Sequence, residues 1–341
     1  MVRYFFQIIF VLVFLGIFHA SAHAQELKRF EVHSYEMGSD FRLIFYASND
    51  SIAEAAVHES WNEVRRLNQI FSDYSMDSEI SLLSQESLPH EWLPVSDDLF
   101  IVLKQAGQIS RQSNGLFDVT MGPLTKLWRA IRQAPEPKLP SDSVVQKLNQ
   151  RVGYGSVHLK EPNQIQLTRS NIEFDFGGIA KGYAAERILY LLSTYGIERA
   201  MINAGGDVTV GDPPPGRTHW EVVVPWIGKE GTSDVQKFKL KNVTIATSGS
   251  VHRSILIDGE RYSHIIDPRT GIGSKKQIQA TVISSAGMLA DAYATVLTIL
   301  NPREGICMIE SLPNLEAFIF QKREDGVRMI TSSGLQSYSR D

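Results

Sequence analysis

The sequence predicts an α+β fold, a single two-lobed domain of mixed or antiparallel sheets with packed helices. Helical and strand patterns are interspersed along the chain, without the strict alternation typical of a doubly wound parallel sheet. From residue 219 onward strand patterns dominate. The pair Asp258-Gly259, between two apolar segments, is a strong signal for a tight antiparallel hairpin.

The N-terminus has the features of a secretory signal peptide. Arg3 precedes an apolar run from Tyr4 to Phe18, and Ala22-His23-Ala24 forms an A-x-A cleavage site. We therefore expect residues 1–24 to be removed and residues 25–341 to form one exported, soluble, periplasmic domain. The alternative is an uncleaved anchor, although the apolar core is short for a membrane span. No cysteine lies near the cleavage site, which argues against a lipid anchor.

Composition excludes several classes of function. The formal net charge of −4 gives no basic excess for nucleic-acid binding. Cys307 is the only cysteine, so no internal disulfide can form, and its apolar helical context predicts a buried side chain. The chain contains no P-loop, H-E-x-x-H, C-x-x-C or G-x-S-x-G motif.

The N-terminal half combines strands and helices. Alternating residues at 30–47 predict one or two strands interrupted at 37–39, and apolar residues spaced by three and four predict a helix ending at Phe71. A polar loop is expected at 75–79, and a helix from Ser96 to Asn114-Gly115. A short helix at 141–150 and strands within 155–167 follow.

The C-terminal half is richer in strands. These are expected at 220–224, 237–240, 243–246, 254–258, 261–265, 280–283, 316–320 and 327–331. Two helices are expected at 285–300 and about 303–311, separated by Asn301-Pro302.

The stretch from Asp175 to Asp207 is predicted to hold a phosphate-bearing ligand. A glycine turn at Gly177-Gly178 leads into an amphipathic helix, a strand at 200–202 and a second turn at 205–206. Glycines let the backbone approach a ligand closely, and a helix N-terminus offers free N–H groups to an anion.

Asp291 and Thr295 suggest a site for a hard cation. They are four residues apart in a predicted helix, so their oxygens share one face, which suits Mg²⁺. The alternative is a surface aspartate and a threonine bonded to its own helix.

Three other segments could serve a ligand or only the fold. His264 and Arg269 could hold an anion, and His264 could move a proton, although the run is also rich in turn residues. The run 247–250 is either a polar ligand loop or an ordinary turn. Met37, Tyr74 and Phe117 could stack on a planar ring, or be core residues.

Eight blocks in order along the chain resemble the FAD:protein FMN transferase family, the ApbE family of flavin transferases. They are Met37-Gly38-Ser39, Tyr74 with Asp77-Ser78-Glu79, Gly115 to Asp118 with Gly122-Pro123-Leu124, Asp175 to Ala184, Asn203 to Asp207, Thr247-Ser248-Gly249, His264 to Gly271, and Asp291 to Thr295. The resemblance covers nearly the whole mature chain and implies an ApbE-like fold.

The resemblance implies Mg²⁺-dependent transfer of FMN from FAD to a threonine of a target protein, with release of AMP. The acceptor would be a periplasmic or membrane-bound flavoprotein subunit. By position, Asp291, Thr295 and the carbonyl of Gly178 match metal ligands, and His264 or Asp267 is a candidate base. The positions that match FAD contacts are Met37, Tyr74, Leu116, Phe117, Asp118, Asp175, Lys181 and His264.

Some positions depart from the family pattern, and two other functions remain open. Ser39 replaces a commoner threonine, and Glu186 stands where aspartate is frequent. One alternative is an FAD pyrophosphatase that uses water as acceptor. The other is a non-catalytic flavin-binding protein.

Overall fold

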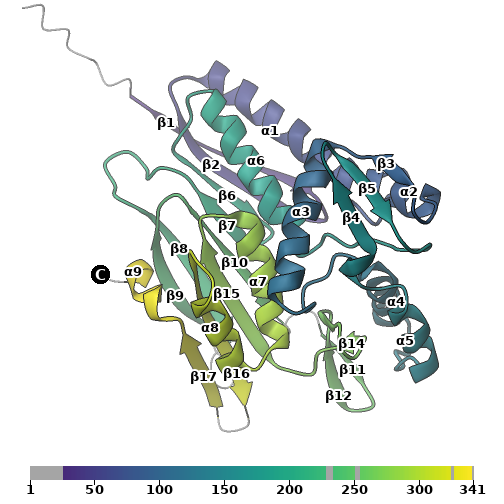
Figure 1. Ribbon diagram of the computed structural model, residues 1–341. Helices are drawn as coiled ribbons and strands as arrows, with labels where there is room; N and C mark the ends of the chain where they lie inside the picture. The colour runs from purple at the N-terminus through teal and green to yellow at the C-terminus, as the bar shows by residue number, and fades with distance from the viewer. Residues whose placement is uncertain (1–25, 228–232, 250–253, 324–325, 340–341) are drawn as a thin grey trace, which may run out of the picture.

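A computed structural model describes residues 26–227, 233–249, 254–323 and 326–339. Its centre is an eight-stranded sheet with the order β1-β2-β6-β7-β10-β15-β16-β17, in which every neighbouring pair is antiparallel (Figure 1). These strands are β1 (Lys28–Glu36), β2 (Ser39–Ala47), β6 (Ala200–Ala204), β7 (Asp207–Val210), β10 (Val243–Gly249), β15 (Ile278–Ser284), β16 (Leu315–Arg323) and β17 (Gly326–Thr331).

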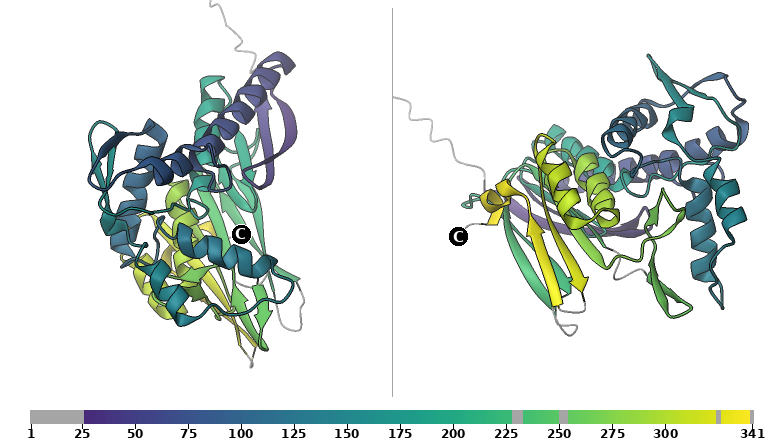
Figure 2. Two further views of the ribbon diagram at one scale, coloured as in Figure 1. Left: turned by 90° about the vertical axis from the view of Figure 1, so that its right-hand side faces the viewer. Right: turned by 60° about the horizontal axis from the view of Figure 1, so that its bottom comes forward.

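Helices cover one face of this sheet, and a hairpin covers the other. The helices are α1 (Asp50–Phe71), α6 (Ala180–Thr194), α7 (Gly287–Ile299) and α8 (Pro302–Glu310), seen between the sheet and a second group of elements in Figure 2. The hairpin β8 (Trp220–Ile227) and β9 (Ser233–Leu240) packs through Val222 and Phe238 against Phe318 of the opposite face.

Strand alternation explains how both faces are filled. Phe41, Leu43 and Phe45 of β2 pack with α1 and α6, whereas Ile44 points into the cluster under the β8–β9 hairpin. Successive side chains of a strand point to opposite faces, so a sheet covered on both faces needs apolar residues at consecutive positions.

The second group lies beside the helical face (Figure 1). It contains α2 (Glu79–Glu86), α3 (Asp97–Gln112), α4 (Gly122–Gln133) and α5 (Asp142–Asn149), with β3 (Trp92–Pro94), β4 (Val157–Lys160) and β5 (Gln164–Leu167). Two small hairpins pack against α4 and α5: β11 (Ser254–Ile257) with β12 (Glu260–Ser263), and β13 (Ile266–Asp267) with β14 (Ile272–Gly273). A 3-10 turn (Tyr154–Ser156) precedes β4, and a second one (Ser333–Leu335) leads into α9 (Gln336–Ser339).

The structure confirms the α+β class with antiparallel sheets. It also confirms the hairpin at Asp258-Gly259, whose φ angles of 50° and 80° are the positive values that such a turn needs. The helices expected at 96–114, 141–150 and 285–300 are present with shifted ends.

Some expectations were wrong. Helices α2 and α4 were not predicted, and the run 247–249 is the end of strand β10, not a loop. Ser250 and the expected signal peptide lie outside the described residues. Cys307 is exposed, because the buried face of α8 consists of residues 302, 305, 306 and 309. Within the described ranges, no helix is long and apolar enough to span a bilayer.

Helices α6 and α7 meet backbone to backbone at two glycines. A Cβ added to Gly182 would lie 2.3 Å from the carbonyl oxygen of Gly287, and one added to Gly287 would lie 2.6 Å from that of Gly182. Glu186, one turn along α6, accepts a hydrogen bond from the Gly287 N–H at 2.5 Å and so caps α7. The two helices are therefore held in a fixed relation.

We expect Gly182→Ala to destabilise the fold by about 3 kcal/mol, because overpacking against backbone cannot be relieved by a side-chain rotation. Urea unfolding of the purified domain measures this. Gly155→Ala is the matched control, because no atom lies within 4 Å of its Cβ position, and its stability should stay near that of the parent protein. Equal stability of the two variants would contradict the close helix contact.

Candidate active site

Two buried carboxylates and a lysine meet at one end of the sheet. Asp207 begins β7, Asp291 lies in α7, and Lys181 lies in the first turn of α6. The Lys181 Nζ is 3.7 Å from Asp207 Oδ2 and 4.0 Å from Asp291 Oδ2. Three segments that are distant in sequence therefore place two acids around one ammonium group.

Each carboxylate is also fixed by a backbone N–H. The Thr247 N–H of β10 donates to Asp207 Oδ1 at 2.9 Å, and the Gly182 N–H donates to Asp291 Oδ2 at 3.3 Å. Lys181 Nζ donates to the Gly177 carbonyl at 3.2 Å, across the turn that precedes its helix. The sheet and both helices thus set the positions of these charges.

Burial gives the two carboxylates a high proton affinity. Burial, and next the nearby Asp291, raise the pKa of Asp207, while Lys181 and the Thr247 N–H oppose the rise. Burial likewise raises the pKa of Asp291, again opposed by Lys181. Two negative charges face one positive charge here, so an added cation would favour the ionised form of both acids.

The Gly178 turn lies against Thr295. A Cβ on Gly178 would be 3.2 Å from Thr295 Oγ1 and 3.4 Å from the Phe117 ring. Thr295 Oγ1 is also 3.2 Å from Ser248 Oγ and 3.4 Å from the Asp291 carbonyl oxygen. The structure therefore brings together Gly178, Asp291 and Thr295, the three residues predicted to hold a metal.

The donor set suits a hard divalent cation. No cluster of three or more His, Cys, Asp or Glu side chains in the described part of the chain could hold a metal. A cation here would depend on carbonyl and hydroxyl oxygens as well as carboxylates, and these are ligands that Mg²⁺ accepts. Lys181 neutralises only one of the two negative charges of Asp207 and Asp291, and the positive charge of the cation would neutralise the other.

Three of the predicted FAD contacts are apolar residues that border this site. Met37 occupies the β1–β2 turn with a φ of 48° and packs against both apolar clusters on the helical side of the sheet. Leu116 and Phe117 follow the positive-φ turn Asn114-Gly115 after α3 and are both buried. The Phe117 ring reaches Gly178, whereas the half-buried Met37 retains exposed surface.

Asp118 and Asp175 have different local roles. Asp118 accepts hydrogen bonds from the N–H and Oγ1 of Thr120 and from the Tyr154 N–H, at 2.7 to 2.8 Å. Burial raises the pKa of Asp118. Asp175 accepts from the Gly177 N–H at 2.8 Å, so it shapes the turn before α6 and keeps one carboxylate oxygen for a ligand.

Tyr74 is the most exposed of the predicted contacts, with 75% of its surface accessible. The Arg129 guanidinium lies 3.8 Å from the centre of its ring, and Arg129 also donates to Asp73 at 2.7 Å. One ring face is covered by a cation, which leaves the ring able to stack a planar ligand on the other face.

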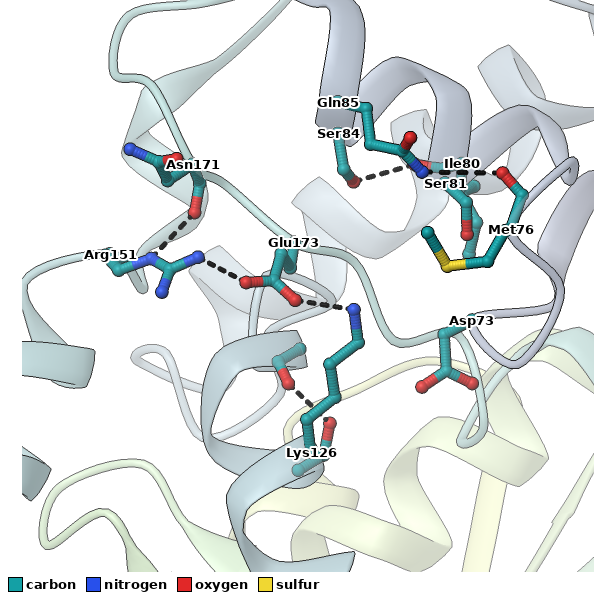
Figure 3. Close-up of polar contacts among 12 residues, drawn as sticks. Asp73, Met76, Ile80, Ser81, Ser84, Gln85, Lys126, Arg151, Asn171 and Glu173 are labelled. Atoms are coloured by element: carbon teal, nitrogen blue, oxygen red, sulfur yellow. Dashed lines mark hydrogen bonds and ion pairs between the residues drawn. The ribbon is translucent and has the colours of Figure 1, made fainter.

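The acidic group next to Asp73 is fully paired. Glu173 accepts hydrogen bonds from both Lys126 and Arg151, and Arg151 also donates to the Asn171 carbonyl (Figure 3). Burial, and then Asp175, raise the pKa of Asp73. These pairs tie α4 to the strand-like segment that leads to Asp175.

His264 lies in the bend between β12 and β13, and Asp267 is the last residue of β13, beside α4. Ile265, next to His264, belongs to the same large apolar cluster as Phe117 and Ala292. Asp267 is paired with Arg269, whose Nε and Nη2 donate at 2.9 and 2.6 Å. Burial acts to raise the pKa of Asp267, but the Arg269 hydrogen bonds outweigh it and hold this pKa below its usual range.

Asp207 ends the stretch predicted to hold a phosphate-bearing ligand, but the sequence assigned it no role of its own at the metal or the ligand. Its signal was the Gly205-Gly206 turn before it, but only the fold shows that it shares Lys181 with Asp291. Ser39 likewise had no role of its own; it was noted in the Met37-Gly38-Ser39 block and for its departure from threonine.

Comparisons with known proteins point to one family. Residues 37–319 match the model of the ApbE family. A "FAD:protein FMN transferase" of Vibrio cholerae is 29% identical over 309 residues, covering 89% of this chain and 90% of the relative. Another with this name from Treponema pallidum is 25% identical over 333 residues, covering 92% and 89%.

Solved structures give the same result for the fold. The flavin transferase ApbE from Vibrio cholerae superposes with a TM-score of 0.83 at 25% identity, covering 92% of this chain and 100% of that one. The apo flavinyl transferase ApbE of Pseudomonas stutzeri gives 0.82 at 22% identity, covering 92% and 97%.

Proposed function

This chain belongs to the ApbE family, and on that premise we propose that it is an FAD:protein FMN transferase that acts on a threonine hydroxyl of another protein. In this reaction the threonine oxygen bonds to the phosphorus of the FMN half of FAD. The bridging P–O bond breaks and AMP leaves. The observation that carries the proposal is the Asp207–Lys181–Asp291 group beside the Gly178 turn.

In this proposal the chain's own residues hold the pyrophosphate and orient it. The Lys181 ammonium group faces the phosphate oxygens, and Met37, Tyr74, Leu116 and Phe117 contact the ring systems of FAD. Asp118 and Asp175 complete the ligand-binding turns.

The proposed Mg²⁺ ligands are Gly178 through its carbonyl, Asp291 and Thr295, with Asp207 nearby. When bound, Mg²⁺ would supply positive charge to the pyrophosphate as negative charge develops. The two buried carboxylates and the contact between Gly178 and Thr295 support this assignment.

His264 is the proposed base. The threonine hydroxyl must lose its proton as it attacks, and a neutral imidazole can accept it. Asp267 is a weaker candidate, because Arg269 occupies both of its oxygens.

We further propose that residues 1–24 are a signal peptide and that residues 25–341 form one exported flavin transferase domain. The acceptor would then be a periplasmic or membrane-bound flavoprotein subunit.

Incubation with FAD, Mg²⁺ and a threonine-containing acceptor tests the function. We expect AMP release together with covalent flavin on the acceptor, seen by in-gel fluorescence, and loss of both when a chelator removes the metal. AMP and FMN without covalent flavin would indicate a pyrophosphatase. Binding of FAD without AMP release would indicate a non-catalytic flavin-binding protein.

A further inference from the structure

Ser39 is a half-buried residue whose hydroxyl oxygen is buried without a hydrogen-bond partner. In the described part of the chain, its Oγ is the one buried side-chain oxygen or nitrogen without a hydrogen-bond partner. Buried polar atoms in folded proteins almost always have a partner, so an exception at the edge of a ligand site requires a reason.

The hydroxyl faces the proposed active site. Ser39 is the first residue of β2 and lies two positions before Phe41, which packs toward α1 and α6. Side chains two apart on a strand share a face, so Ser39 points to the helical side, where the N-terminus of α6 lies.

The Gly205 turn lies against the Ser39 hydroxyl, and the Lys181 side chain reaches the same turn. A Cβ on Gly205 would be 2.8 Å from Ser39 Oγ and 3.9 Å from Lys181 Cδ. Gly205 has a φ of 67° and donates its N–H to the Asp40 carbonyl at 2.9 Å, so the turn is held against the start of β2. The Ser39 hydroxyl and the Lys181 side chain therefore approach the same turn.

A purely structural serine does not explain this geometry. Ser34, on the adjacent strand, donates to Glu36 at 2.7 Å, which is how a structural hydroxyl in this hairpin is satisfied. The Ser39 hydroxyl has lost its hydrogen bonds to water and has gained none within the protein. This lowers the stability of the protein when no ligand is bound. A ligand that accepts its hydrogen bond would remove that cost.

We propose that Ser39 is a further substrate-binding residue, whose hydroxyl donates a hydrogen bond to an oxygen of the FAD pyrophosphate, next to Lys181. This rests on the proposed function, since it names a contact to the same substrate. Anionic oxygens are strong acceptors, and Lys181 places positive charge beside the same turn.

The test compares binding with stability. Affinities for FAD and for ADP, which carries the pyrophosphate without the flavin, are measured with Mg²⁺ and without acceptor protein. We expect Ser39→Ala to weaken both by about tenfold, as for a lost hydrogen bond to a charged group. Its melting temperature without ligand should not fall. Ser39→Thr should bind as the parent protein does.

Ser34→Ala is the matched control. It removes a satisfied hydroxyl from the same hairpin, so it should lower the melting temperature and leave FAD affinity unchanged. Unchanged FAD affinity in Ser39→Ala would overturn the inference and leave the proposed function standing. Weaker binding of FAD but not of ADP would overturn the pyrophosphate contact. Failure of the parent protein to bind FAD would instead reject the proposed function.

Discussion

Replacing Asp291 with asparagine is expected to lower Mg²⁺-dependent AMP release at least about 100-fold, because a metal-held transition state loses its only proposed carboxylate ligand. Asparagine keeps the shape of the side chain, and its amide oxygen can still accept the Gly182 N–H. The fold should therefore survive, and circular dichroism with thermal unfolding checks that it does. The rate is measured as AMP released at saturating FAD over a series of Mg²⁺ concentrations.

Asp212→Asn is the matched control for this variant. Asp212 follows β7 at the end opposite Asp207 and lies 3.8 Å from Lys241. The same loss of one negative charge should there leave the rate unchanged. Full Mg²⁺-dependent turnover in Asp291→Asn would show that the metal is held elsewhere. If the substitution changed neither FAD binding nor cellular function, a non-catalytic flavin-binding protein would be favoured.

Replacing His264 with alanine should lower flavin transfer about 100-fold, which is a usual contribution of a positioned general base. Covalent flavin on the acceptor is measured against time over a range of pH. The parent protein should gain rate as the base loses its proton with rising pH, and His264→Ala should lack this rise. FAD affinity is measured in parallel, because His264 also matches a proposed FAD contact.

Asp267→Asn separates the two candidate bases. Its pKa is held below the usual range by Arg269, so it is ionised and weakly basic near neutral pH. We expect only a small change in rate, accompanied by some loss of stability as the Arg269 pair is broken. A larger loss in Asp267→Asn than in His264→Ala, at matched stability, would reverse the assignment.

The sequence predicted those elements whose signals are local. The Asp258-Gly259 hairpin depends on two residues with positive φ, and α3 begins directly after Ser96, whose side chain accepts a hydrogen bond from the Leu99 N–H at 3.2 Å. Helix α4 was missed because Gly122-Pro123 resembles a turn. Proline at the first turn of a helix is in fact favourable, and the spacing of Leu124 and Trp128 was the available signal.

Other features depend on contacts that a sequence does not show. Thr247 to Gly249 belong to a strand because β15 pairs with them. The role of Asp207 depends on the meeting of three segments. The proposed metal ligands Asp291 and Thr295 could be grouped from their helical spacing, but the approach of Thr295 to Gly178 depends on how α6 and α7 pack. The proposed substrate, FAD, comes from the resemblance to the family and not from residue spacing.

The sheet order has a consequence for how the protein folds. Strand β2 pairs with β6, which is far from it in sequence, and Phe41 lies opposite Ala204. Strand β10 lies between β7 and β15, so it must pair with both before Asp207 and Asp291 can come together. Contacts between such distant residues form slowly, because long loops must close first. A chain that emerges N-terminus first cannot complete its active site until α7 has emerged. In the proposed function, FAD binding therefore requires a chain folded through α7, and a chain truncated before α7 will be inactive even with α1 to α6 intact.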